Sequence, residues 1–321
     1  MTGTGPGYDV GLGIVPDRRG PISMPHPAIP ADLPRVAPRE QDSSKRDFGR
    51  VLVVGGAAGM AGAPVLAAMA TLRSGAGLVE LLVPECVVGI AAAFDPCVMT
   101  VGLQAAAGGF ALPAAAAIRE RAARADALVV GPGIGRSAAV ADIVVDLWRD
   151  LEQPAVFDAD ALWALARTGQ ETLRRHAGPR ILTPHAGEML RLLGRDPAAP
   201  APGGRPWLED EARRLAAAID AVVVLKGAGT LIAVPGRESG REWRNETGNP
   251  GMATAGTGDV LSGVVGALLA QGLPPASAAR LGVWVHGRAG DAAAADLGQT
   301  SMTARDLLDR LPVGFHAAGC P

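Results

Sequence analysis

The sequence has few cysteines, almost no net charge and no apolar run long enough to cross a bilayer. Its three cysteines, Cys86, Cys97 and Cys320, have no CxxC spacing, so neither a disulfide framework nor a zinc site is expected. The net charge of −2 offers no basic surface for nucleic acid. The longest apolar run, Val260 to Ala270, is too short for a membrane-spanning helix, so no membrane partner is expected.

Two further motifs are missing. The first 39 residues lack a basic start followed by an apolar core, so no secretory signal is predicted and a cytoplasmic location is expected. No GxxxxGK[ST] phosphate loop occurs anywhere in the chain. Residues 1–45 are rich in proline, glycine and charge and are predicted to form a tail or extended arm, whereas residues 46–321 are predicted to form the folded domain.

Strand-like apolar runs alternate with helix-like segments through most of the chain. This alternation predicts an α/β fold with a doubly wound, mostly parallel sheet and helices on both faces. The expected strands cover residues 51–54, 78–83, 98–103, 127–130, 155–157, 180–182, 221–225 and 231–234. The expected helices cover residues 64–73, 85–94, 112–125, 137–149, 207–219, 260–269, 275–296 and 303–311. Glycine-rich and charged turns follow these strands, and we expect them to share one edge of the sheet.

The stretch NETGNPGMATAGTGDVLSG, residues 245–263, is the most informative part of the sequence. Its Gly256-Thr257-Gly258 segment opens an apolar helix, where free N–H groups and the helix dipole favour an anion. Thr257 adds a hydroxyl or caps the helix. Asp259 would repel a bound phosphate, so it takes a proton or engages a metal, unless it only complements the helix dipole.

A lysine ends the strand at 221–225 and is followed by small residues, Lys226-Gly227-Ala228-Gly229-Thr230. Such a lysine can hold phosphate oxygens as a point charge beside open N–H groups. A plain β-turn would explain the glycines of this segment but not the lysine.

Carboxylates and a histidine follow two other strands. Asp158 is predicted to face the site, acting through a magnesium ion and its waters, whereas Asp160 is predicted to cap the next helix. Taken alone, His185 and Glu188 would be a turn histidine and a partner of the helix dipole.

Glycines also follow the strands at 51–54 and 127–130. The first set, with Glu80 ending the next strand, invites comparison with a dinucleotide fingerprint, but its spacing is GxxGxxG rather than GxGxxG. The second set, ending in Gly133 and Gly135, fits either a ligand floor or a tight strand-to-helix turn.

The segment GNPGMATAGTGDVLSG resembles the signature of the NAD(P)H-hydrate dehydratases, a branch of the ribokinase-like superfamily that uses ATP or ADP to repair hydrated nicotinamide cofactors. The resemblance covers roughly residues 43–311. Two positions depart from the family pattern: Ala255 replaces a usual glycine and Trp163 replaces a common asparagine.

The resemblance implies a role for each of these turns. Asp259 would be the catalytic base, next to an anion hole formed by Gly256, Thr257 and Gly258. Substrate contacts would come from Gly62, Ala63, Gly133, Gly135, His185 and Asp259. Nucleotide contacts would come from Lys226, Gly227, Ala228, Gly229, Thr230 and Gly258. Asp158 and Glu188 would lie near a magnesium ion, and a homo-oligomer, most simply a tetramer, is expected.

The expected reaction is dehydration of (S)-NADHX or NADPHX to NADH or NADPH, coupled to cleavage of ADP or ATP, with ADP favoured. Two alternatives remain open at the level of the sequence. A small-molecule kinase of the same fold, acting on a vitamin-type alcohol, would need the same aspartate and anion hole. A nucleotide-sensing protein without catalysis would not require Asp259.

Overall fold

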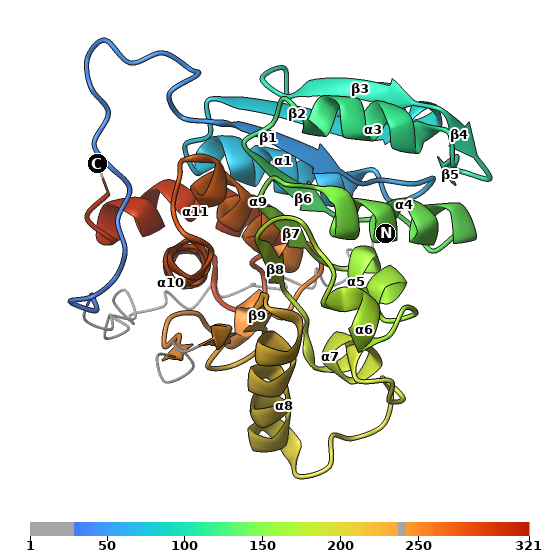
Figure 1. Cartoon of the computed structure of the whole chain (residues 1–321). Coiled ribbons are helices and arrows are strands. Elements are labelled where there is room, and N and C mark those ends of the chain that lie inside the picture. The colour runs from blue at the N-terminus through green and yellow to red at the C-terminus, as the bar shows by residue number, and fades with distance from the viewer. Residues whose placement is uncertain (1–28, 237–241, 321) are drawn as a thin grey trace, which may run out of the picture.

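The computed structural model describes residues 29–236 and 242–320, and its centre is a nine-stranded sheet in the order β11-β10-β9-β8-β7-β6-β1-β2-β3 (Figure 1). Every neighbouring pair from β9 to β3 is parallel, which confirms the predicted doubly wound sheet. The strands are β1 (Arg50–Val54), β2 (Leu78–Pro84), β3 (Met99–Leu103), β6 (Ala127–Val130), β7 (Ala155–Phe157), β8 (Arg180–Leu182), β9 (Val222–Leu225), β10 (Leu231–Ala233) and β11 (Trp243–Arg244).

Helices cover both faces of the sheet because alternate strand residues point to opposite sides. In β1, Val51 and Val53 belong to one core and Leu52 and Val54 to the other. The first core is covered by α1 (Gly62–Arg73), α9 (Thr257–Ala270), α10 (Pro275–Leu297) and α11 (Ala304–Ala317). The second is covered by α3 (Ala114–Ala122), α4 (Ala138–Asp150), α5 (Asp160–Leu165), α7 (Ala186–Leu192) and α8 (Gly204–Ile219). Figure 1 shows α10 and α11, orange to red, on the opposite side from α5, α7 and α8.

Several short elements were missing from the prediction. They are the hairpin β4 (Ala105–Ala106) and β5 (Gly109–Phe110), the short helix α6 (Gln170–Leu173) and the edge strand β11. The helix expected over residues 85–94 is present as the shorter α2 (Val88–Ala92), directly after a 3₁₀ turn at Glu85–Val87. Elements of two to five residues are too short to show a periodicity. The last helix also differs, since α11 runs through Pro312 to Ala317 instead of ending at Leu311.

Part of the predicted arm packs against the domain. Leu33 is only 6% exposed and joins the core beneath α10 and α11. Asp32 forms an ion pair with Arg280 of α10 at 2.6 Å, and Arg39 donates a hydrogen bond to the carbonyl of Gly75 at 2.7 Å. Residues 1–28 of the arm lie outside the described residues. In the described part of the chain, no helix is long and apolar enough to cross a membrane.

Candidate active site

Lys226 connects the ends of three neighbouring strands. Its N–H donates to the carbonyl of Pro184, which follows β8, at 2.8 Å. Its Nζ donates to Oδ1 of Asp158, which follows β7, at 2.8 Å, and lies 3.7 Å from Oε2 of Glu188. Asp158 is only 1% exposed. Two acidic residues and one lysine predicted from separate turns therefore meet at one point.

The start of α9 lies against the same lysine. Gly256 is the residue before the helix and has a φ of +92°, a conformation that glycine adopts without strain. A Cβ on Gly258 would lie 3.2 Å from Nζ of Lys226, so the glycine allows the helix start to approach the lysine closely. Among the described residues, no acceptor is recorded for the N–H groups of Thr257, Gly258 and Asp259. These groups are therefore open to an anion, as the prediction requires, and the anion hole itself stays a prediction.

Thr257 does not cap α9. Its hydroxyl instead donates to the carbonyls of Met252 and Thr254, both at 3.0 Å. The hydroxyl therefore holds the loop that leads into the helix, and of the two roles considered for Thr257 the helix cap is excluded.

The charges in this cluster shift one another's protonation. Burial, followed by the charge of Asp158, raises the pKa of Asp259 to about 7. Burial likewise raises the pKa of Glu188 to about 7. Burial by itself lowers the pKa of Lys226, but the charges of Asp158 and Glu188 more than offset this, so its pKa lies above the ordinary value. Near neutral pH the cluster therefore holds a fixed cation beside a carboxylate that can take up or release a proton.

His185 and Glu188 form the start of α7. The backbone N–H of His185 donates to Oε2 of Glu188 at 2.8 Å, and Nδ1 of His185 accepts from the N–H groups of Gly187 and Glu188. This reciprocal capping fixes Glu188 where it faces Lys226. Burial and the charge of Lys226 lower the pKa of His185, so its ring is neutral at physiological pH.

Asp160 is not the residue that caps α5. That position belongs to Ala159, with a φ of +51°, and Asp160 is the first helical residue. Its carboxylate accepts from the N–H of Gly135 at 3.1 Å and pairs with Nε of Arg136 at 2.7 Å. The predicted helix cap is therefore wrong, and the side chain instead holds the glycine turn after β6.

A cavity of about 580 Å³ opens beside Lys226. Its wall contains the whole turn from Lys226 to Thr230, together with Thr257 and Gly258. It also contains Arg244 to Pro250, Met252, Ala253, Leu261, Val283, His286 and Gly287. All five residues of this turn, which were predicted to bind the nucleotide, thus line one cavity. Asp259 directly follows Gly258, which also lies in the cavity wall.

The loop between β11 and α9 is held against α10. The carboxylate of Asp291 accepts from the N–H of Gly248 and from Nδ2 of Asn249, both at 3.1 Å. A Cβ on Gly287 would lie 2.1 Å from the hydroxyl oxygen of Thr247, so α10 must have glycine there for the loop to lie this close. Nε2 of His286 donates to the carbonyl of Thr257 at 2.9 Å, and burial lowers the pKa of His286 to about 4. Both His286 and Asp291 therefore hold this loop.

The predicted substrate glycines lie outside the wall of the cavity. A Cβ on Gly133 would lie 3.1 Å from Cβ of Ala63, so the turn after β6 and the start of α1, where Gly62 lies, are neighbours. The same turn adjoins the acidic cluster, because a Cβ on Gly131 would lie 1.9 Å from the carbonyl oxygen of Asp158. The two groups of predicted contacts therefore lie on different surfaces that both adjoin the residues around Asp158.

The described residues contain no group of three or more histidine, cysteine, aspartate or glutamate side chains that could hold a metal ion. The two predicted metal ligands, Asp158 and Glu188, have the ammonium of Lys226 as their common partner instead. The side chains present thus do not form a direct magnesium site.

Comparison with known proteins identifies the family of this chain. The family model described as NAD(P)H-hydrate dehydratase matches residues 51–313. The chain belongs to this family. The match includes all the site residues predicted above.

Individual relatives agree with the family match. A bifunctional NAD(P)H-hydrate repair enzyme from Moorella thermoacetica is 46% identical over 88% of this chain and 51% of its own length. An ADP-dependent (S)-NAD(P)H-hydrate dehydratase from Neisseria meningitidis is 41% identical over 79% of this chain and 80% of its own. The chain spans about half the length of the bifunctional relatives that it matches.

The solved structures agree on the fold. An ADP/ATP-dependent NAD(P)H-hydrate dehydratase from Bacillus subtilis, co-crystallised with ATP and Mg²⁺, matches with a TM-score of 0.72 and 27% identity. The match covers 89% of this chain and 99% of that one. The fold is ribokinase-like.

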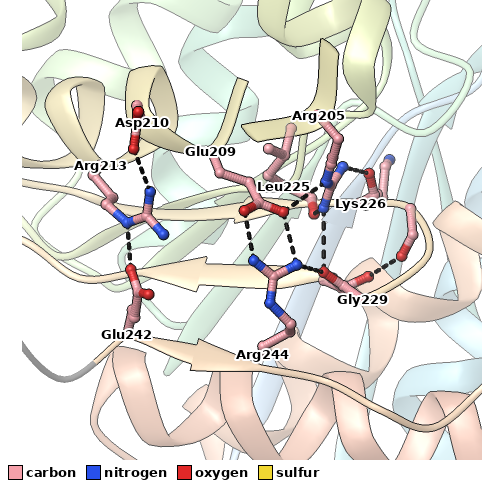
Figure 2. A network of polar contacts seen from close by, with 11 residues as sticks. Arg205, Glu209, Asp210, Arg213, Leu225, Lys226, Gly229, Glu242 and Arg244 are labelled. Carbon is pink, nitrogen blue, oxygen red and sulfur yellow. Dashed lines mark hydrogen bonds and ion pairs between the residues drawn. The ribbon is translucent and has the colours of Figure 1, made fainter. Parts of the chain in front are cut away.

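Three charged residues near the cavity did not enter the sequence prediction: Arg205 and Glu209 of α8, and Arg244 of β11 (Figure 2). Arg205 and Glu209 resemble an ordinary ion pair four residues apart on a helix, and Arg244 lies in a two-residue strand. Only the pairing of β11 with β10 brings Arg244 next to Glu209.

Proposed function

We propose that this protein dehydrates (S)-NADHX and NADPHX back to NADH and NADPH, coupled to the cleavage of ADP to AMP and phosphate. The supporting observation is the position of Asp259: at the free N-terminus of α9, close to Lys226 and beside the cavity lined by Lys226 to Thr230. A kinase-type site needs a base for the attacking hydroxyl and donors for the charge on the transferred phosphoryl group. Membership of the NAD(P)H-hydrate dehydratase family supports this choice of substrate.

In this proposal Asp259 removes the proton from the hydroxyl on the hydrated ring. The hydroxyl oxygen attacks the terminal phosphate of ADP, forms an oxygen–phosphorus bond and releases AMP. The electron pair of the ring nitrogen then expels phosphate, and a proton leaves the neighbouring ring carbon. The net change is loss of water from the ring and hydrolysis of one phosphoanhydride bond.

The remaining residues have supporting roles in the proposal. The N–H groups of Thr257 to Asp259 and the ammonium of Lys226 stabilise the charge on the phosphoryl group. The glycine turns at Gly62, Ala63, Gly133 and Gly135, together with His185, contact the hydrated dinucleotide. Mg²⁺ would neutralise charge on the phosphates of the nucleotide, and Asp158 and Glu188 would act on it through water. We also propose a cytoplasmic enzyme that assembles as a homo-oligomer, with a tetramer favoured.

The decisive experiment supplies the purified protein with hydrated NADH, Mg²⁺ and either ADP or ATP, and follows the absorbance band of the reduced nicotinamide. Recovery of the band with ADP is expected, and recovery with ATP alone would keep the reaction but reverse the donor. Asp259→Asn should bind ADP like the unchanged protein and turn over at least about a hundredfold more slowly, since it lacks the base. A stable phosphorylated alcohol without band recovery would instead favour the small-molecule kinase.

A further inference from the structure

A network of two arginines and one glutamate lies behind the turn from Lys226 to Thr230 (Figure 2). Arg205 uses all three of its side-chain nitrogens in this network. Its Nη1 donates to the carbonyl of Lys226 at 2.8 Å, and its Nη2 donates to the carbonyls of Leu225 at 2.9 Å and Gly229 at 3.3 Å. One planar side chain therefore holds three carbonyls of a five-residue segment.

Glu209 holds Arg205 in place together with a second arginine. It lies one turn after Arg205 on α8, is 5% exposed, and accepts from Nε of Arg205 at 3.0 Å. Arg244 contacts both its oxygens, at 2.8 and 2.5 Å, and its Nη1 lies 3.5 Å from the carbonyl of Gly229. Hydrogen bonds from Arg244 and Arg205 keep the pKa of Glu209 below its ordinary value, so the carboxylate stays charged. Paired arginine–carboxylate contacts of this kind fix direction as well as distance.

Fixing the carbonyls also fixes the N–H groups of the turn. The described residues contain no cis peptide bond, and in a trans peptide the N–H points away from the preceding carbonyl. The carbonyls of Lys226 and Gly229 point at Arg205, so the N–H groups of Gly227 and Thr230 point away from it. No acceptor among the described residues is recorded for the N–H groups of Gly227, Ala228 and Gly229. These donors lie in the wall of the cavity.

The two glycines make room for the arginines. Gly227 has a φ of +137°, and a Cβ there would lie 3.0 Å from Nη1 of Arg205. Gly229 has a φ of +65°, and a Cβ there would lie 3.2 Å from Nη1 of Arg244. The small residues after Lys226 thus serve the arginines behind the turn as well as a ligand in front of it.

We propose that Arg205, Glu209 and Arg244 are positioning residues that orient the N–H groups of the Lys226–Thr230 turn toward the phosphates of the adenine nucleotide. The inference rests on the proposed function only for the identity of that ligand. The network acts from behind the turn through Arg205, whereas Arg244 also lines the cavity and adds positive charge there. Loss of this network should weaken nucleotide binding without removing the proposed catalytic base, Asp259.

The test measures the Kd of ADP by isothermal titration calorimetry for Arg205→Lys, Arg244→Lys and a matched control. Lysine keeps the charge but cannot reach three carbonyls at once. Arg205→Lys should raise the Kd of ADP about tenfold and Arg244→Lys about threefold. The control is Arg213→Lys, two turns further along α8, because Arg213 pairs with Asp210 and Glu242 and with no carbonyl of the turn (Figure 2). It should leave the Kd within twofold.

A second readout separates positioning from loss of folding. Each variant is melted without nucleotide, and binding is measured at a temperature where its circular dichroism matches that of the unchanged protein. In repair assays at saturating ADP, Arg205→Lys should retain most of its kcat while KM for ADP rises. A folded Arg205→Lys protein that binds ADP within twofold of the unchanged protein would overturn the inference. Normal ADP binding by the unchanged protein without repair of hydrated NADH would overturn only the proposed function.

Discussion

Asp259 carries the main conflict between function and stability at the scale of single residues. In the proposed reaction Asp259 is the catalytic base, which must gain and lose its proton at the working pH, and burial raises its pKa from 3.8 to about 7. The unfolded chain ionises this group above about pH 4, whereas the folded protein resists ionisation up to about pH 7. Stability is therefore lost as the pH rises through this window.

Replacing Asp259 by asparagine removes that loss. At pH 8 the Asp259→Asn variant should be more stable than the unchanged protein by on the order of 1–3 kcal/mol, since partial exposure reduces the roughly 1.4 kcal/mol expected for each pKa unit. At pH 5 the difference should be smaller. Denaturant titration at both values measures it, with the exposed Asp309→Asn as the control. If the variant were less stable than the unchanged protein at pH 8, burial of the ionised Asp259 would not be reducing the stability of the folded protein.

Individual site residues were predictable where they follow a strand, because parallel strands deliver their carboxyl ends to one edge. Asp158 and Lys226 were selected on this basis and Glu188 on the family resemblance, and the three lie together in the structure. What joins them was not predictable: the ion pair of Lys226 with Asp158 spans 68 residues of sequence. Such a pair depends on strand order, which local patterns do not encode.

At the scale of elements, the position of α9 decides where Asp259 lies. The helix packs on α1 through Gly263, whose added Cβ would lie 2.1 Å from the carbonyl oxygen of Ala67. Gly266 allows a similar approach to Val129 of β6, where a Cβ would lie 2.4 Å from Cγ2 of that valine. The glycines within the helix thus set how closely it approaches both the sheet and its neighbouring helix.

Gly263→Ala should therefore separate α9 from α1. Alanine has the higher intrinsic helix propensity, yet the contact with a backbone oxygen cannot relax by rotating a side chain. We expect a loss of about 1–3 kcal/mol in the free energy of unfolding, together with lower turnover, because the helix start would shift away from Lys226. Denaturant titration measures the first and the repair assay the second.

The matched control is Gly89→Ala in α2, where no atom lies within 4 Å of an added Cβ. This variant should be neutral or slightly more stable. Equal stability of the Gly263 and Gly89 variants would contradict the packing argument.

The sequence predicted α9 well because its apolar run is long. It did not predict the antiparallel edge formed by β10 and β11, because a strand of two or three residues does not reveal whether it pairs parallel or antiparallel.

At the scale of the whole molecule, segments far apart in sequence hold the C-terminal helices. Leu33 is buried among core residues of α10 and α11, and Arg280 pairs with Asp32 across 248 positions. The predicted division of the chain at residue 46 stays a prediction. The described part of the arm nevertheless contacts the same helices that hold the loop leading to the site.

Binding of ADP should raise the melting temperature of the whole domain. The cavity wall combines the turn between β9 and β10, Arg244 of β11, and residues of α9 and α10, so a ligand that fills it contacts segments that lie far apart in the sequence. A ligand that binds only the folded state adds about 2.7 kcal/mol at a hundred times its Kd. For a chain of this size that corresponds to a rise in Tm of about 4 °C with ADP.

Two variants test whether this rise in Tm comes from ADP bound in the cavity beside Lys226. Lys226→Ala should lose most of the rise in Tm, because it removes the cation from the nucleotide turn and leaves Asp158 without its partner. Asp259→Asn should keep the rise, since it removes a negative charge beside the bound phosphates rather than a contact to them. Differential scanning fluorimetry over a series of ADP concentrations measures both. If Lys226→Ala kept the full shift, ADP would bind somewhere other than this cavity, and the proposed division between nucleotide turn and catalytic carboxylate would be wrong.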